Sequence, residues 1–98
     1  MTIQKTQTGT ELTVALSGRL DTTTAPQLEA ELKSSLEGVT ALTLDFKGLE
    51  YISSAGLRVL LSAQKAMLRQ GKMVVCNVND TILEVFEVTG FSDVLTLA

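Results

Sequence analysis

Apolar and polar residues alternate near the start of the chain, and this alternation predicts a β-hairpin. Ile3 to Gln7 form a weak strand pattern, and Thr8 to Thr10 carry a glycine-centred turn signal. From Leu12 to Leu16 every second residue is a large apolar one, which is typical of a strand with one buried face. We therefore expect two antiparallel strands before the first helix.

A leucine repeat predicts the first helix. From Leu28 to Leu36 a leucine recurs every four residues, which places these side chains on one helix face. Thr24 and Gln27 have the spacing of a capping box, and Pro26 fits the first turn because the N–H it lacks has no helical partner there. We expect Gly38 to end this segment.

A longer helix is expected from about Ala55 to Gln70, closed by Gly71. Its apolar residues gather on one side, which should pack against a sheet; they are Leu57, Leu60, Leu61, Met67 and Leu68. A second face carries polar and basic residues; they are Arg58, Ser62, Lys65 and Arg69. Lysine and arginine are mostly exposed in proteins, so this stripe is either solvent-facing surface or a docking surface for an acidic partner.

Strands flank that helix on both sides, and a third helix follows. Ala41 to Phe46 and Met73 to Cys76 are the strand segments, and the second is continuously apolar, as in a strand covered on both faces. We expect the third helix to begin at a cap on Asn79 or Asp80 and to stop at Gly90.

The elements together predict an α/β fold with the order β-β-α-β-α-β-α, followed by a short last strand at Val94 to Leu97. Strands separated by helices imply right-handed crossovers. We therefore expect a largely parallel or mixed sheet of four to five strands, with a mixed edge contributed by the opening hairpin.

Composition and charge exclude several classes of protein. Hydrophobic residues make up 45% of the 98-residue chain and charged residues 19%, so we expect residues 1–98 to fold as one domain. The net charge of −3 and the scattered basic residues argue against nucleic-acid binding. No apolar run approaches the ~20 residues that cross a bilayer, and the first nine residues are polar. We therefore expect a cytoplasmic protein.

The residues on which most enzymes depend are missing or poorly placed. The chain has no histidine and one cysteine, Cys76, which excludes Ser-His-Asp and Cys-His catalysis and the usual zinc sites. The common glycine-rich phosphate-binding motifs are absent. We interpret Cys76 as a core residue and Glu84 with Glu87 as a solvent-facing helix surface, and we regard Asp45, at a strand end, as the stronger carboxylate. We expect neither enzyme activity nor a cofactor or metal.

The turn that leads into the long helix is the most informative segment. Ser54 stands where an N-cap belongs, so the N–H groups of Ala55, Gly56 and Leu57 should lack helical partners. Those donors and the helix dipole favour an anion, including a phosphate esterified to Ser54. Glycine has a lower helix propensity than alanine, so Gly56 in the first turn needs a reason. Its missing Cβ would let a partner backbone or a phosphate come close. A serine here is more often only a cap, and spacing alone leaves both interpretations open.

Two motifs resemble those of a known family. Residues 18–26 read Gly-Arg-Leu-Asp-Thr-Thr-Thr-Ala-Pro, and residues 45–57 read Asp-Phe-Lys-Gly-Leu-Glu-Tyr-Ile-Ser-Ser-Ala-Gly-Leu. Together with Thr89-Gly90-Phe91 they resemble the STAS domain, and among its branches the bacterial anti-sigma factor antagonists. The resemblance spans nearly the whole chain, and in such relatives the chain usually continues into a final helix.

The resemblance implies a partner switch. The serine that aligns with Ser54 is phosphorylated by an anti-sigma factor that is also a serine kinase, and a metal-dependent serine phosphatase reverses this. Many members carry Asp where this chain has Ser53, so Ser53 is the alternative site. The implied partner-binding residues lie in the loop at Asp21 and in the turn and first turn of the long helix; they are Asp21, Thr22, Thr23, Ser53, Ser54, Ala55, Gly56 and Arg58.

Two other functions stay open beside this one. The resemblance also fits a STAS subunit that is not phosphorylated and that regulates the ATPase of a membrane transporter of the lipid-transport type. A nucleotide-binding or hydrolytic protein is the third reading, and the missing histidine and phosphate-binding motifs count against it.

Overall fold

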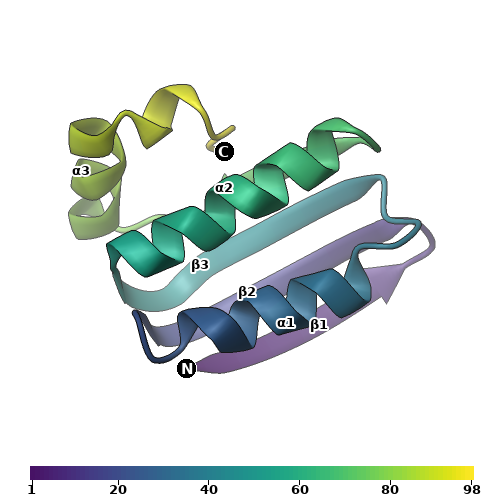
Figure 1. The fold of residues 1–98 in the computed structure, drawn as a ribbon, viewed down its shortest axis with the longest axis horizontal. Helices are drawn as coiled ribbons and strands as arrows, with labels where there is room; N and C mark the ends of the chain where they lie inside the picture. The colour runs from purple at the N-terminus through teal and green to yellow at the C-terminus, as the bar shows by residue number, and fades with distance from the viewer.

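Strands and helices alternate after an opening hairpin, as the sequence pattern predicts (Figure 1). The computed structural model describes residues 1–98. Its main elements are β1 (Thr2–Thr8), β2 (Glu11–Leu20), α1 (Ala25–Ser35), β3 (Ala41–Ile52), α2 (Ser54–Leu68), β4 (Lys72–Cys76) and α3 (Asp80–Thr89). No helix in the chain is both long enough and apolar enough to span a bilayer.

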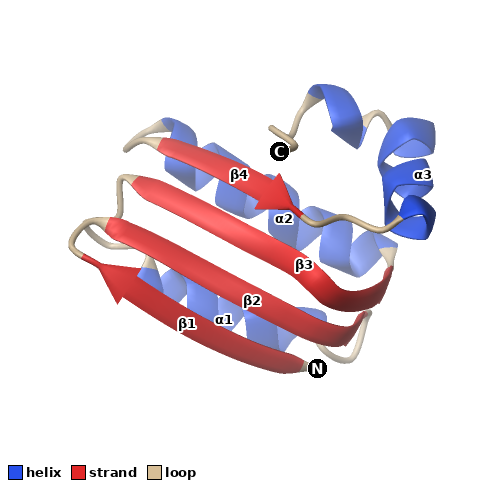
Figure 2. Cartoon of the chain, turned by 180° about the vertical axis from the view of Figure 1, so that it is seen from behind, coloured by secondary structure: helices blue, strands red, loops and turns tan.

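The four strands form one mixed sheet in the order β1-β2-β3-β4 (Figure 2). β1 pairs with β2 antiparallel, whereas β2 with β3 and β3 with β4 are parallel. This confirms the predicted hairpin and the predicted crossovers. β3 is longer than its apolar run, because residues between 48 and 52 continue to pair with the end of β2 across two register shifts.

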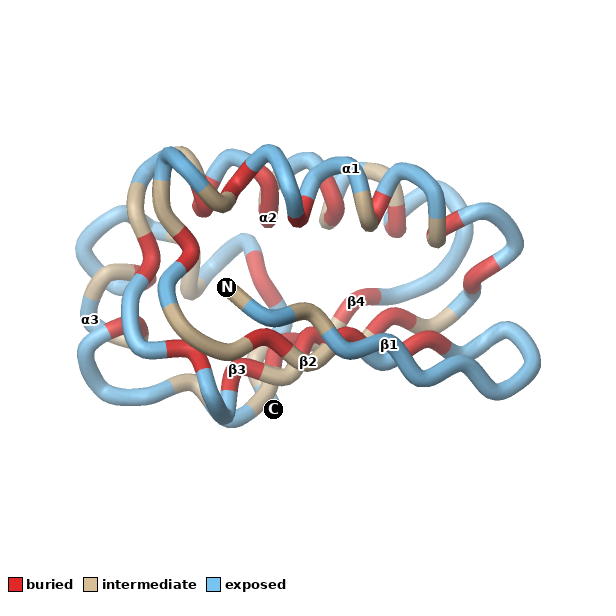
Figure 3. Tube along the Cα trace, turned by 90° about the horizontal axis from the view of Figure 1, so that it is seen from below, coloured by how far each residue is buried: buried red, intermediate tan, exposed pale blue.

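The helices α1 and α2 cover one face of the sheet, and the opposite face carries no helix (Figures 2 and 3). In β4, Met73 and Val75 are buried under α2, while Val74 and Cys76 are only half-buried on the open face. The predictions that this strand is covered on both faces and that Cys76 belongs to the core are therefore wrong. A continuous apolar run does not distinguish a doubly covered strand from one whose outer residues tolerate partial exposure.

The core lies between the sheet and its helices. It consists of 24 apolar residues, and no polar residue is buried with them. The leucines of α1 point inward, and the basic stripe of α2 is exposed, as are Glu84 and Glu87 on α3. Leu68 was expected to face the sheet but is 70% exposed, because adjacent helical residues point about 100° apart and Met67 takes the buried direction.

The end of the chain does not form the predicted strand. Phe91–Asp93 form a 3₁₀ turn after Gly90, whose positive φ ends α3. Val94 and Leu95 both donate their N–H groups to the Phe91 carbonyl. The first two residues of the expected strand therefore belong to this turn. A single parallel bridge joins Leu97 to Val75 at the edge of β4.

Candidate functional site

The ends of two parallel strands bring the two loops of the candidate site together. Leu20 at the end of β2 pairs with Ile52 at the end of β3. The N–H of Ser53 then donates to the carbonyl of Leu20, with an N–O distance of 2.9 Å. The loop that begins at Asp21 and the turn into α2 therefore start side by side at the carboxyl edge of the sheet, where sites in α/β proteins usually form.

The start of α2 is shifted by one residue from the prediction. Ser53, with extended backbone, is the N-cap, and Ser54 is the first helical residue. The N–H of Leu57 donates to the Ser53 carbonyl at 3.0 Å, so the first-turn donors without helical partners are those of Ser54, Ala55 and Gly56. No side chain caps them and the first turn carries no acidic residue, which leaves this end of the helix favourable to an anion.

The two adjacent serines have different surroundings. Ser54 is exposed at the helix start. The hydroxyl oxygen of Ser53 is buried and has no hydrogen-bond partner. The turn thus presents Ser54 to the outside and turns Ser53 Oγ inward.

Gly56 is buried beneath the turn and is not part of its outer surface. A Cβ atom at this position would lie 2.7 Å from Leu20 Cγ and 2.8 Å from Ile52 Cγ1. The missing side chain therefore lets α2 pack closely on the ends of β2 and β3. This packing accounts for the glycine without a partner, and the contact of Gly56 with a partner stays a prediction.

The Asp21 loop is held by its own side chains. Asp21 Oδ1 accepts the backbone N–H groups of Thr23 and Thr24 at 3.0 and 3.1 Å. Thr24 Oγ1 accepts the N–H of Asp21 and donates to the Arg19 carbonyl. Thr24 does occupy the N-cap position of α1, but it makes no capping bond, so the predicted capping box with Gln27 is wrong.

Charge and hydrogen bonding favour the ionised form of Asp21. The Thr24 backbone N–H is the main cause that lowers the pKa of this carboxyl, with further contributions from Thr23 N–H, the Thr24 hydroxyl and Arg19. The loop therefore presents a carboxylate beside the start of α2 at neutral pH.

An arginine–tyrosine pair next to this loop was not identified from the sequence. The Arg19 guanidinium lies over the Tyr51 ring, 4.3 Å from its centre, and Arg19 Nε is 3.8 Å from Asp21 Oδ2. Arg19 and Tyr51 are register partners in β2 and β3, so only the strand pairing, which sequence spacing does not give, could have revealed the contact. Tyr51 is 37% exposed.

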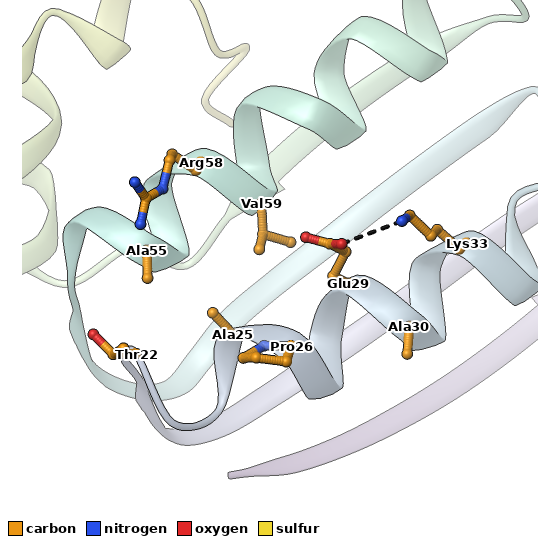
Figure 4. A pocket seen from close by; sticks show the side chains of 9 residues that line it. All are labelled: Thr22, Ala25, Pro26, Glu29, Ala30, Lys33, Ala55, Arg58 and Val59. Atoms are coloured by element: carbon orange, nitrogen blue, oxygen red, sulfur yellow. Dashed lines mark ion pairs between the residues drawn. The ribbon is translucent and has the colours of Figure 1, made fainter.

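A hollow between the starts of α1 and α2 joins the two loops (Figure 4). Thr22 and Ala25 line it on one side, and Ala55 and Arg58 line it on the other. Arg58 follows Ser54 by one helical turn, so the two residues lie on neighbouring parts of the same face. The structure thus brings together the predicted residues of both loops, with Gly56 beneath them.

The other titratable candidates, Asp45 and Cys76, lie outside the two loops of the site. Asp45 Oδ1 accepts hydrogen bonds from the Asn77 side chain and the Lys47 N–H, and these lower the pKa of its carboxyl. Burial is the main cause that raises the pKa of the Cys76 thiol. The chain contains no cluster of three histidine, cysteine, aspartate or glutamate residues that could hold a metal ion. What the site offers is an exposed hydroxyl, free backbone donors and a carboxylate.

Comparisons with known proteins agree on one family. A family model described as the STAS domain matches residues 2–98. The putative anti-sigma factor antagonist BtrV of Bordetella bronchiseptica is 40% identical over 89 residues, which cover 89% of this chain and 77% of that protein.

Two solved structures of the Bacillus anti-sigma factor antagonist SpoIIAA have the same fold. The unphosphorylated form gives a TM-score of 0.78 at 21% identity and covers 99% of this chain and 87% of its own. The phosphorylated form gives 0.77 at 22% identity and covers 99% and 91%.

Proposed function

The chain belongs to the STAS domain family, and we propose that it is an anti-sigma factor antagonist that phosphorylation of Ser54 switches off. In its unphosphorylated form it binds an anti-sigma factor with serine kinase activity and releases the sigma factor. A metal-dependent phosphatase restores this form. In this role Ser54 is a substrate and the chain is no enzyme. Because such partners act in the cytoplasm, we infer that this chain does too.

The observation that carries the proposal is the exposed Ser54 at the uncapped start of α2. A kinase must reach the hydroxyl that it modifies, and the buried Oγ of Ser53 does not offer one. Burial therefore favours Ser54 over Ser53. The relative BtrV is named a putative antagonist, which supports this role over regulation of a transporter ATPase.

A phosphate at Ser54 would act locally. It carries a charge of about −1.5 to −2, and the free N–H groups of the first turn accommodate this charge without refolding. At a packed interface the same charge brings desolvation and repulsion from nearby acids such as Asp21. A loss of about 3–4 kcal/mol in binding free energy corresponds to a several-hundred-fold loss of affinity.

The test is to incubate the chain with the anti-sigma factor kinase encoded beside it and ATP, and to map the phosphate by mass spectrometry. We expect one phosphate on Ser54, none in Ser54→Ala, and normal modification in Ser53→Ala. Modification that persists in Ser54→Ala, or that disappears only in Ser53→Ala, would contradict the proposal.

A further inference from the structure

The surface between α1 and α2 continues from the Ser54 turn as a groove. The hollow at the helix starts has a volume of about 490 Å³, and a second one of about 180 Å³ follows it along the same two helices. Both are lined by Glu29, Lys33 and Val59, so they form one continuous groove. It runs the length of α1, whose 11 residues span about 16 Å.

The floor of this groove is apolar, and three of the apolar residues that α2 contributes to it are alanines. Val59 and Ala63 of α2 and Leu32 of α1 are buried at its base. Ala55 and Ala66 are half-buried at its two ends, on α2. Small residues leave the space between the helices shallow and open, which suits the apolar face of a third helix.

The two rims of the groove differ in charge. On the α1 rim, Glu29 and Lys33 neutralise each other with a 3.2 Å ion pair (Figure 4). On the α2 side, Arg58 lines the groove, and Lys65 and the C-cap residue Arg69 continue an exposed stripe beside it. None of the three forms an ion pair. They recur at a spacing of seven and four residues, and α2 contains no Asp or Glu to balance them.

The positive charge of this row is opposite in sign to the net charge of the whole chain. The net charge is −3, yet three of the eight Lys and Arg residues lie on one exposed stripe of α2 and its C-cap, beside the groove. Unpaired charges of one sign along a groove select a partner of the opposite sign and accelerate its association.

We propose that this groove, which begins at Ala55 beside the Ser54 turn, binds an amphipathic helix of the anti-sigma factor partner. The helix places small and apolar residues on the groove floor and acidic residues along α2. It is about three turns long, to match α1. This inference rests on the proposed function, because it names a surface for the same partner, and it makes phosphorylation of Ser54 an event at one end of the docking groove.

The first test reverses charge at the end of the groove away from Ser54. Lys65→Glu with Arg69→Glu should weaken binding of the unphosphorylated chain to the purified kinase at least tenfold by calorimetry. Lys47→Glu makes the same kind of change on an exposed residue outside the groove and should alter affinity less than twofold. An affinity of the double variant within twofold of the wild type would overturn the proposal.

Phosphorylation separates this proposal from the proposed function. Lys65 lies 11 residues beyond Ser54, about 16 Å along the helix, so saturating kinase should still phosphorylate the double variant at Ser54. Failure of the kinase to bind or modify the wild-type chain would remove the proposed function itself. Normal phosphorylation with unchanged affinity would remove only the groove.

A second measurement identifies the occupant. Ser62 is exposed and lines the groove, so a photoreactive p-benzoylphenylalanine in its place should cross-link to the partner. We expect the cross-linked peptide to lie in a helix with aspartate or glutamate at helical spacing. A cross-link to a basic or non-helical segment would overturn the proposal.

Discussion

At Gly56 one absent methyl group decides how closely α2 approaches the sheet. A Cβ there would come within 2.7–2.8 Å of the Leu20 and Ile52 side chains, which is closer than packed carbon atoms allow. Gly56→Ala should therefore lower the free energy of unfolding by about 1–3 kcal/mol, although alanine is the better helix former. Urea unfolding measures this.

Ser54→Ala is the matched control for that change, because it lies in the same helical turn and is exposed. It should alter the free energy of unfolding by less than about 0.5 kcal/mol. Equal stabilities of Gly56→Ala and the wild type would mean that α2 is free to move away from the strand ends.

The Asp21 carboxylate should make stability depend on pH. Folding lowers its pKa, chiefly through the Thr24 N–H, so its contribution is present above the ordinary aspartate value of about 3.9 and is lost as pH falls through the folded value. Asp21→Asn should therefore be less stable than the wild type at pH 7, with a deficit that shrinks below about pH 4. Thermal unfolding across pH 3–7 checks this.

Asp93→Asn is the control for that series, because Asp93 is exposed and its side chain accepts no hydrogen bond. Its stability should follow the wild type throughout. A deficit of Asp21→Asn that stays constant down to pH 3 would show that the charge of Asp21 plays no part.

At the scale of elements, one glutamine ties the two helices of the covering layer together. Gln70 Nε2, just beyond the end of α2, donates to the carbonyls of Leu36 and Val39 at 2.6 Å each. Gln70→Ala leaves both carbonyls without this donor and should cost about 1–2 kcal/mol in urea unfolding.

Gln64 within α2 offers the opposite case, because its Oε1 atom is buried without a partner. Gln64→Leu removes that unsatisfied acceptor and should raise the free energy of unfolding by up to about 1 kcal/mol. Loss of stability of similar size in both glutamine variants would contradict this distinction.

At the scale of the whole molecule, phosphorylation should change binding and leave the fold intact. The phosphate sits on an exposed first-turn residue whose neighbours supply free N–H groups, so the core has no reason to rearrange. Backbone amide spectra of the two forms should differ near residues 21–24 and 53–58 only. Widespread shifts among core residues such as Val14 and Leu44 would contradict this.

Local signals in the sequence predicted most of the architecture. Asn79 does cap α3, and its side chain accepts the Ile82 N–H at 2.8 Å, because a cap depends only on neighbouring residues. The role of Gly56 could not be predicted, since it depends on Leu20, which is 36 positions away in the chain and adjacent only after strand pairing. The burial of Ser53 Oγ has the same origin.

Surfaces were harder to predict than elements. Cys76 lies in an apolar run that fits either a covered or an open sheet face, and only the placement of both crossover helices on one side decides between them. The stripe of Arg58, Lys65 and Arg69 was recognised as exposed, but the groove beside it required the packing of α1 against α2.

The central claim is that one phosphate on Ser54 controls binding to the anti-sigma factor. Isothermal titration of the same kinase with unphosphorylated chain and with chain phosphorylated only at Ser54 tests it most directly. We predict a several-hundred-fold weaker affinity for the phosphorylated form, equivalent to about 3–4 kcal/mol. Affinities that agree within threefold would contradict the account.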